Sequence, residues 1–184
     1  MPITSRLNQI LKVILLPLTL LMLLCSTATT FAASEIYLVR HAEKQVDGTR
    51  DPALTQTGHQ RAQWLANWLK GKNVQHIYST NYQRTQQTVA PLAQQTGLTV
   101  RAYDPRQLAQ FAATLKQTTD KTNGIVVVVG HSNTTPQLVQ LLGGDAGNPI
   151  VESEYDRIYH LTLDPTQSLN DNKIKTQRFN SQTK

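Results

Sequence analysis

One stretch, Glu35-Ile36-Tyr37-Leu38-Val39-Arg40-His41-Ala42-Glu43, combines a predicted strand with candidate site residues. Its first part, 36–39, is apolar and rich in strand-favouring residues, which is typical of a strand buried on both faces in a parallel sheet. The strand ends abruptly in Arg40 and His41. Because ligands of parallel sheets bind just beyond the carboxyl ends of the strands, this cation and this imidazole indicate a binding or catalytic site.

The composition is that of one globular domain. The chain has 184 residues, of which 39% are hydrophobic, and this argues against disorder over most of its length. Its 18 basic and 12 acidic residues are scattered along the chain, so no nucleic-acid partner is predicted. The single cysteine, Cys25, excludes a disulfide framework. Cys25 also falls in the leader described next, which removes cysteine-dependent phosphatase chemistry from the candidates.

Residues 1–33 have the layout of a secretory signal peptide. Arg6 and Lys12 precede an uncharged run, 13–33, that ends in small residues. We expect cleavage within 26–34, which leaves 34–184 as a single domain with a polar C-terminal tail. The mature protein is then expected to be periplasmic or secreted, without stable membrane insertion. The alternative is an uncleaved anchor, which the Ser/Thr-rich end of the run disfavours.

The rest of the chain alternates between helical and strand patterns. Five β-branched residues in a row, 125–129, predict a central strand covered on both faces. Further strands are expected at 74–79 and 98–103, and helices at about 54–70, 84–96, 107–116 and 136–142. The segments 157–163 and 174–179 are expected to pair antiparallel. This order predicts an α/β three-layer sandwich, a mostly parallel central sheet flanked by helices.

Three local features of the helices can be predicted. Ser79-Thr80-Asn81 is a favourable N-cap cluster for the helix that follows it. Pro91 should kink or divide that helix. Trp64 and Trp68, four residues apart, are expected to be packing side chains rather than binding residues.

The polar residues at the strand ends suggest phosphate chemistry. Arg40, His41, Asp104 and His131 follow strands, and Arg84 opens a helix, so the parallel topology favours their convergence. Arginine offers planar, permanently charged donors to phosphate, and helix N-termini add further N–H groups. One imidazole can attack phosphorus while the other donates a hydrogen bond, and Asp104 can protonate the leaving oxygen.

Other candidate chemistries are not supported by the sequence. His59, His76 and His160 follow no strong strand and are assigned no role. No set of His, Asp and Glu occurs at metal-ligand spacing, so neither a metal nor another cofactor is expected.

Four ordered motifs together resemble the histidine phosphatase superfamily (branch 1), with its phosphoglycerate mutase-like fold, over residues 35–163. They are Arg40-His41-Ala42-Glu43, Leu54-Thr55-Gln56-Thr57-Gly58, Ser79-Thr80 with Arg84-Thr85-Gln86-Gln87-Thr88, and Gly130-His131-Ser132. The resemblance implies that His41 is the phosphorylated nucleophile and that Arg40, Arg84 and His131 bind the phosphoryl group. It also implies a general acid after the third strand, where Asp104 stands. Ala42 replaces the more usual glycine, and Glu43, Glu152 and Glu154 remain alternative acids.

The resemblance implies a metal-independent phosphatase that hydrolyses phosphate monoesters through a phosphohistidine, and the leader implies that it is exported. The short chain is similar both to compact bacterial phosphohistidine phosphatases and to exported phosphatases of lipopolysaccharide-core sugar phosphates. The leader favours the second group, so the expected partner is a phosphorylated small molecule or sugar phosphate, selected by the loops 44–53, 104–110 and 144–156. A phosphohistidine (protein) phosphatase and a non-catalytic phospho-ligand binder are the alternatives. Mutase activity is not expected, because mutases of the family carry longer insertions over the site.

Overall fold

The computed structural model describes residues 34–120, 123–163 and 174–178, so the predicted signal peptide lies outside the described residues. Helices and strands alternate along most of this part of the chain. In order they are β1 (Ser34–Arg40), α2 (Gln56–Trp68), β2 (Val74–Thr80), α3 (Gln83–Thr96), β3 (Val100–Tyr103), α4 (Leu108–Thr119), β4 (Ile125–Gly130), α5 (Thr134–Leu141), β5 (Arg157–Leu163) and β6 (Ile174–Arg178).

The strands form one sheet in the order β3-β2-β4-β1-β5-β6. The four strands from β1 to β4 run parallel, whereas β5 pairs antiparallel with β1 and β6 antiparallel with β5. The expected antiparallel pair near the C-terminus is therefore confirmed. β4 lies between β1 and β2 and is buried along its whole length, as its run of β-branched residues predicts.

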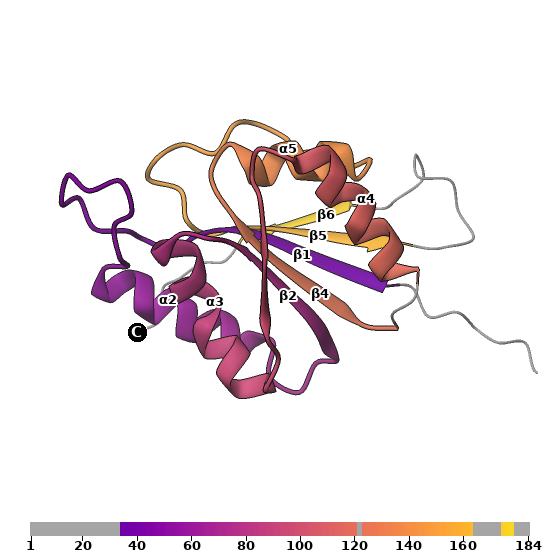
Figure 1. The fold of residues 1–184 in the computed structure, drawn as a ribbon, viewed down its shortest axis with the longest axis horizontal. Coiled ribbons are helices and arrows are strands. Elements are labelled where there is room, and N and C mark those ends of the chain that lie inside the picture. The colour runs from indigo at the N-terminus through magenta and orange to yellow at the C-terminus, as the bar shows by residue number, and fades with distance from the viewer. Residues whose placement is uncertain (1–33, 121–122, 164–173, 179–184) are drawn as a thin grey trace, which may run out of the picture. The chain divides into compact units, whose positions relative to one another are not determined.

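Helices cover both faces of the sheet (Figure 1). α4 and α5 pack on one face, and α2 and α3 pack on the other. Side chains alternate between the two cores because successive residues of a strand point to opposite faces. Along β1, Ile36 and Leu38 join the core under α4 and α5, while Tyr37 and Val39 join the core under α2 and α3. The predicted three-layer α/β sandwich is confirmed.

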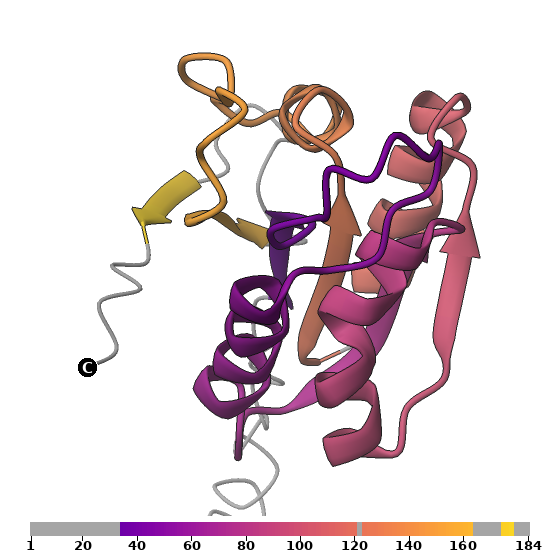
Figure 2. The same cartoon turned by 90° about the vertical axis from the view of Figure 1, so that its left-hand side faces the viewer.

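The parallel strands present their carboxyl ends at one edge of the sheet. In Figure 2 the arrowheads of β3 and β4 point toward that edge, and the indigo loop after β1 and the orange loop after α5 lie there. Arg40 ends β1, Thr80 ends β2, Tyr103 ends β3 and Gly130 ends β4. Side chains from distant parts of the sequence are therefore brought together at this edge.

The predicted N-cap of α3 is wrong. Tyr82 occupies the N-cap position, and its own side chain makes no capping hydrogen bond. The carboxylate of Asp51, from the loop after β1, instead accepts a hydrogen bond from the backbone N–H of Gln83 at 2.8 Å. A residue from another segment thus satisfies a free N–H group of the helix terminus. Thr80, from the predicted cap cluster, makes contacts within the candidate site described below.

Two expectations about side chains in the helices have different outcomes. Pro91 does not divide α3, which continues to Thr96, and the buried side chains of Val89 and Leu92 on either side of Pro91 anchor the helix to the core. Trp64 and Trp68 stack with their ring centroids 6.0 Å apart and pack against the core under α2 and α3. Their predicted packing role is confirmed.

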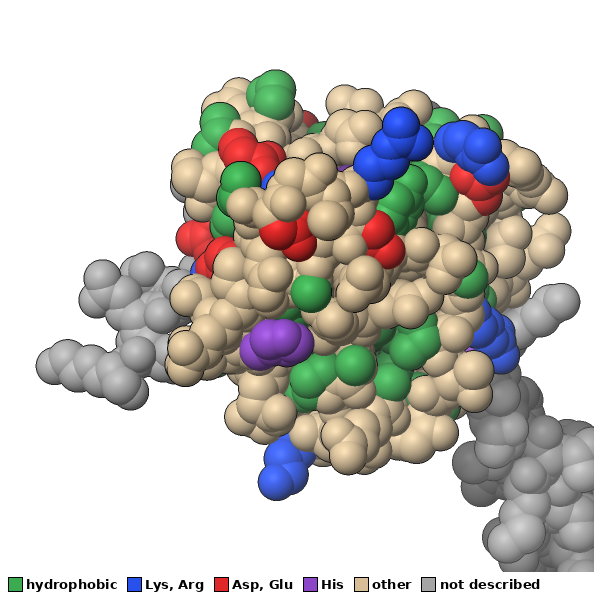
Figure 3. Space-filling view, turned by 60° about the vertical axis from the view of Figure 1, so that its left-hand side comes forward, with side chains coloured by type: hydrophobic (Ala, Val, Ile, Leu, Met, Phe, Trp, Pro, Cys, Tyr) green, Lys and Arg blue, Asp and Glu red, His purple; other side chains and the backbone are tan. Residues whose placement is uncertain are grey.

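The helices and one face of the surface bear on possible membrane and nucleic-acid partners. None of the helices in this part of the chain is long and apolar enough to cross a bilayer. Acidic and basic side chains are interspersed on the face in Figure 3, without a continuous basic stripe.

Candidate active site

Four of the predicted site residues meet at the carboxyl edge of the sheet. Arg40 is the last residue of β1 and His41 follows it, while His131 directly follows β4. Because Arg40 pairs in register with Gly130, the two histidines lie side by side, with ring centroids 5.6 Å apart and the rings in an edge-on arrangement. Arg84, in the first turn of α3, is close enough for its charge to lower the pKa of both imidazoles.

His41 is held as a neutral ring with a defined tautomer. It is 3% exposed, and its Nδ1 lies 2.8 Å from the carbonyl oxygen of Ala42. Because a carbonyl oxygen can only accept, Nδ1 carries the proton and Nε2 carries the lone pair. Burial lowers the pKa of His41 most, and the charges of Arg40, His131 and Arg84 lower it further. The hydrogen bond to Ala42 acts in the opposite direction, and the resulting pKa is about 3. The ring is therefore neutral at physiological pH.

His131 is positioned by Thr80. The Nε2 atom of His131 lies 3.0 Å from Oγ1 of Thr80, which is also 2.9 Å from Oγ1 of Thr85. Burial, and then the charges of Arg84 and Arg40, lower the pKa of His131 to about 4, so this ring is neutral too. A neutral imidazole has a single N–H. Because the Thr80 hydroxyl donates to Thr85, it accepts from His131, and the N–H of this ring is on Nε2.

Arg40 is enclosed by the loop that follows α5. Its Nη1 donates to the carbonyl oxygens of Val151, Glu152 and Glu154 at 2.9–3.0 Å, and its Nη2 donates to the carboxylate of Glu152 at 2.7 Å. The guanidinium also lies over the ring of Tyr155, with Cζ 4.2 Å from the centroid. Although Arg40 is only 3% exposed, its Nε makes no hydrogen bond.

Arg84 is less fully satisfied than Arg40. Its Cζ lies 4.5 Å from the centroid of the Tyr82 ring, and its Nη1 lies 3.5 Å from Oδ1 of Asp51. The Nε and Nη1 atoms of Arg84 are buried and make no hydrogen bond. Across the described residues, these two atoms and Nε of Arg40 are the buried side-chain nitrogens or oxygens without a hydrogen-bond partner. Unpaired buried donors are costly, so the three nitrogens indicate a place for an anion with several oxygens.

Two tyrosines beside the histidines were not found by the sequence analysis. The ring centroid of Tyr82 lies 5.1 Å from that of His131, and the centroid of Tyr155 lies 6.1 Å from that of His41. Tyr82 precedes α3 and Tyr155 lies in a loop. Neither belongs to a periodic pattern or to one of the four motifs, so no sequence signal distinguishes them.

The motif that begins at Arg84 supports the backbone around His41. Oγ1 of Thr88 accepts a hydrogen bond from the N–H of Ala42 at 2.9 Å and donates to the carbonyl oxygen of Arg84 at 2.6 Å. Oε1 of Gln87 accepts from the N–H of Leu54 at 2.8 Å. Ala42 is completely buried, so the site accommodates an alanine at this position.

Gly58 lets α2 approach the segment after His41. A Cβ at this position would run into the carbonyl oxygen of Glu43 and would lie 3.1 Å from Cβ of Leu54. Thr55 caps α2 by accepting a hydrogen bond from the N–H of Gly58 at 3.1 Å. The motif at 54–58 thus serves close packing next to the site.

Two of the alternative acids are held in ion pairs with arginines. Glu43 accepts two-point hydrogen bonds from Arg61, at 2.6–3.1 Å, and although burial opposes it, these bonds lower the pKa of Glu43. Glu154 accepts from Nε and Nη2 of Arg157 at 2.7 and 2.8 Å. Both carboxylates thereby act as counter-ions for nearby guanidinium groups.

Asp104, the predicted general acid, lines a neighbouring pocket. Its carboxylate accepts from Nε and Nη2 of Arg106 at 3.0 and 2.8 Å, and these bonds lower the pKa of Asp104. Tyr82 separates this pocket from His131, and neither His41 nor His131 lines it. The lining residues are Asn81, Tyr82, Ala102, Tyr103, Asp104, Pro105 and Arg106. The role of Asp104 as acid stays a prediction.

Glu152 is the alternative acid that contacts the convergent residues. Its carboxylate binds Arg40 at 2.7 Å and lies 3.6 Å from Nζ of Lys44, while 71% of its side chain is exposed. The described residues contain no group of three or more His, Cys, Asp or Glu side chains arranged to hold a metal ion.

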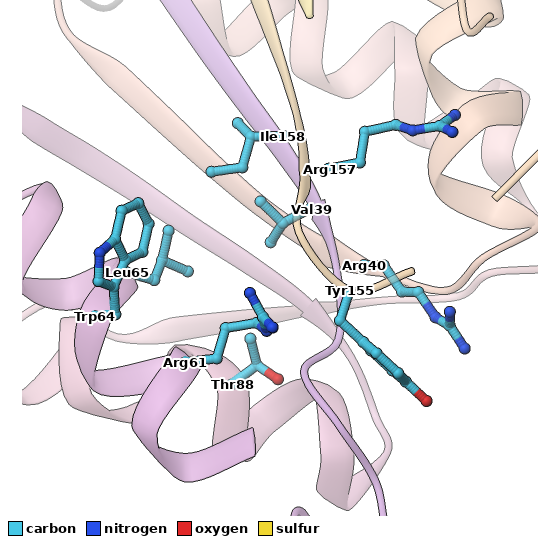
Figure 4. Close-up of a pocket in the computed structure, with 9 residues that line it drawn as sticks. All are labelled: Val39, Arg40, Arg61, Trp64, Leu65, Thr88, Tyr155, Arg157 and Ile158. Carbon is cyan, nitrogen blue, oxygen red and sulfur yellow. The ribbon is translucent and has the colours of Figure 1, made fainter. Parts of the chain in front are cut away.

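A further pocket lies behind Arg40, on the side of α2 (Figure 4). Figure 4 shows Arg40 and Tyr155 side by side at one end, with Trp64 and Leu65 of α2 at the other. Its full lining is Val39, Arg40, Arg61, Trp64, Leu65, Thr88, Tyr155, Arg157 and Ile158. This pocket touches the candidate site only through Arg40 and Tyr155.

Comparison with known proteins agrees with this arrangement. Residues 36–106 match the model of the histidine phosphatase superfamily (branch 1). The protein named "Probable phosphoglycerate mutase GpmB" of Yersinia pestis (strain Pestoides F) is 36% identical over 78 residues, which cover 39% of this chain and 36% of that protein. The chain thus matches little more than a third of the length of the relatives of this group.

Solved structures share the fold. The protein histidine phosphatase SixA, complexed with tungstate, superposes with a TM-score of 0.65 at 20% identity over 78% of this chain and 96% of that chain. The mycobacterial glucosyl-3-phosphoglycerate phosphatase superposes with a TM-score of 0.58 at 16% identity over 80% of this chain and 99% of that chain. Residues 36–106 are thus similar to the histidine phosphatase superfamily (branch 1), and the chain shares the fold of these solved structures.

Proposed function

We propose that the protein is a phosphatase that hydrolyses phosphate monoesters through a phosphohistidine on Nε2 of His41. The observation that carries the proposal is the set of three buried, unpaired nitrogens of Arg40 and Arg84 around two neutral imidazoles. A phosphoryl group supplies negative charge and several acceptor oxygens, and it therefore matches these donors in both charge and number.

His41 is suited to the first chemical step. Its neutral ring presents the Nε2 lone pair to phosphorus, while Nδ1–H remains bonded to the carbonyl oxygen of Ala42. That bond fixes the ring orientation and stabilises the positive charge that develops as the Nε2–P bond forms. Arg40 and Arg84 bind the non-bridging oxygens, and the leaving oxygen takes up a proton and departs as an alcohol.

The second step regenerates the enzyme. Water attacks the phosphorus of the phosphohistidine, the Nε2–P bond breaks, and inorganic phosphate leaves. His131, whose ring lies beside that of His41, stabilises the phosphoryl oxygens in both steps. Two steps of this kind replace one direct hydrolysis, which is extremely slow for phosphate monoesters.

The test is hydrolysis of p-nitrophenyl phosphate, with a chelator present, by wild type, His41→Ala and His59→Ala. His59 is exposed on α2 and serves as the matched control. We expect turnover by wild type and His59→Ala, and none by His41→Ala. Rapid quenching should trap an acid-labile phosphoryl group on wild type only. A fully active His41→Ala variant would refute the mechanism.

The predicted substrate and location extend this proposal. The leader at 1–33 supports export, and an exported enzyme would act on a phosphorylated small molecule or sugar phosphate, lipopolysaccharide-core sugar phosphates among them. The similar mycobacterial protein is described as a phosphatase of glucosyl-3-phosphoglycerate, itself a sugar-bearing ester. Fractionation of cells that produce the full chain tests the location. A panel of sugar phosphates tests the substrate, and retention in the cytoplasm would contradict export.

A phosphohistidine on a protein is the second candidate substrate. The likeness in fold to SixA, described as a protein histidine phosphatase, favours it. The two candidates separate when a phosphorylated histidine-containing domain and a sugar phosphate are supplied at equal concentration. Binding of phosphate without hydrolysis of either ester would instead support a non-catalytic role.

A further inference from the structure

We propose that Glu152 is the general acid and base of the reaction, an inference that rests on the phosphatase function proposed above. It protonates the leaving oxygen in the first step and takes a proton from water in the second. Glu152 binds Arg40 and is exposed, whereas the other candidate carboxylates form ion pairs with other arginines.

Glu152 stands beside the position of the phosphoryl group. Its carboxylate accepts from Nη2 of Arg40 at 2.7 Å, while Nε of the same guanidinium is unpaired. Nη2 carries two N–H groups, and Glu152 takes one of them. A phosphoryl oxygen that binds Nε can share Nη2 with Glu152, so a single guanidinium places the two groups next to each other.

Glu152 also lies toward the mouth of the site. His41 is 3% exposed and attacks from the base, whereas 71% of the Glu152 side chain is exposed. In-line transfer puts the leaving oxygen on the side of phosphorus opposite to the nucleophile. The leaving oxygen therefore points away from His41 and toward solvent, where Glu152 can reach it.

The backbone of the loop keeps Glu152 in this place. The carbonyl oxygens of Val151, Glu152 and Glu154 all accept from Nη1 of Arg40. The loop is thereby fixed on the guanidinium on both sides of residue 152, while most of the Glu152 side chain is exposed at the site.

The competing carboxylates are occupied elsewhere. Glu43 and Glu154 each accept two-point hydrogen bonds from an arginine outside the phosphate-binding pair. Asp104 is bound by Arg106 in the pocket beyond Tyr82. Among the four carboxylates considered, Glu152 is the one whose partner is itself a proposed phosphate-binding residue.

Glu152 gives up one proton in the first step and regains one in the second. Protonated Glu152 gives its proton to the ester oxygen as the P–O bond breaks and the Nε2–P bond forms on His41, which yields an alcohol and the Glu152 carboxylate. A water molecule then attacks phosphorus, its proton passes to Glu152, the Nε2–P bond breaks, and phosphate is released. Phosphate monoesters have a second ionisation near pH 6, so the monoanionic ester can supply the first proton.

The charges around Glu152 match this cycle. Arg40 and Lys44 face its carboxylate, and Tyr155 lies on the other side of the Arg40 guanidinium. A bound phosphoryl group would contact the same Arg40 guanidinium, so the substrate and the Glu152 carboxylate would lie next to each other.

The dependence on the leaving group tests the proposal. The test compares wild type with three variants, Glu152→Gln, Asp104→Asn and Asp145→Asn, on two esters. The leaving group of p-nitrophenyl phosphate needs little protonation, whereas the alkoxide of glycerol phosphate needs a proton. Asp145 is an exposed residue of the same loop, and its replacement removes the same charge. For Glu152→Gln we expect kcat/KM on glycerol phosphate to fall about 10²–10⁴-fold, with a loss at least tenfold smaller on p-nitrophenyl phosphate.

Other outcomes overturn the assignment. Equal losses on both esters would make Glu152 a residue that only positions Arg40, and faster turnover by Glu152→Gln would make it a carboxylate that competes with phosphate. A loss dependent on the leaving group in Asp104→Asn, but not in Glu152→Gln, would return the role to Asp104. Failure of the parent function is a separate result, because then wild type would hydrolyse neither ester.

Discussion

The two histidines of the candidate site should make the protein less stable at pH 5 than at pH 7. Burial, and then the neighbouring charges, lower the pKa of His41 to about 3, from 6.5 for an exposed histidine. A histidine whose folded-state pKa is depressed takes up a proton more readily in the unfolded chain. The free energy of unfolding therefore falls as the pH drops through the window from about 6.5 toward 3.

The magnitude follows from proton binding by the unfolded chain. An imidazole with an ordinary pKa is about a quarter protonated at pH 7 and almost fully protonated at pH 5, whereas folded His41 stays neutral at both. At about 1.4 kcal/mol per pH unit for one proton, the loss is roughly 2 kcal/mol for His41. His131, with its pKa lowered to about 4, acts in the same direction, and its partial exposure makes its share smaller.

Urea unfolding at pH 7 and pH 5, followed by the fluorescence of Trp64 and Trp68, measures this loss. In His41→Asn the side chain takes up no proton in this range. Between pH 7 and pH 5 the free energy of unfolding of this variant should therefore fall by about 2 kcal/mol less than that of wild type. His59→Asn, a change at an exposed position, should behave like wild type. Identical pH dependence in wild type and His41→Asn would refute the claim that the folded protein holds His41 neutral.

Three further substitutions test other parts of the site. Thr80→Val should lower kcat about tenfold, because His131 loses its hydrogen-bond partner, and Thr80→Ser should restore it; steady-state kinetics would show otherwise if the serine variant stayed slow. Gly58→Ala should destabilise the fold by about 1–3 kcal/mol in thermal unfolding, since its Cβ would run into Glu43, and an unchanged midpoint would contradict this. Arg84→Gln should weaken competitive inhibition by inorganic phosphate by about 1.5–3 kcal/mol, and an unaltered inhibition constant would speak against phosphate binding at this residue.

The position of the site could be predicted because the topology follows from strand patterns. Arg40 and His41 end one apolar run and His131 follows another, and parallel strands present their carboxyl ends at one edge. Arg84 was identified from its place at the start of a helix. Each of these inferences needs only local sequence and the alternation of strands with helices.

The partners of the site residues could not be predicted in the same way. From its local sequence, Thr80 is predicted to be part of a helix cap. It contacts His131 only because β2 and β4 are neighbours in the sheet. The carboxylate of Glu43 follows the nucleophile in sequence, yet it turns to Arg61 on α2. Such pairings depend on side-chain directions across the fold, and the sequence alone does not show which guanidinium each candidate acid meets.

The unpaired nitrogens show why the site departs from the packing rules that govern the rest of the core. A buried guanidinium without acceptors destabilises the folded chain, and the acceptors that Arg40 and Arg84 do have, from the loop after α5 and from Asp51, offset that cost only in part. An anion that satisfies the remaining nitrogens removes the rest of the cost. Under the proposed function, the donors that weaken the free protein are the source of its affinity for a phosphoryl group. Glu152 and the backbone around it bind Arg40 from the loop after α5. In the mechanism proposed above, this one loop therefore both positions the guanidinium and supplies the proton.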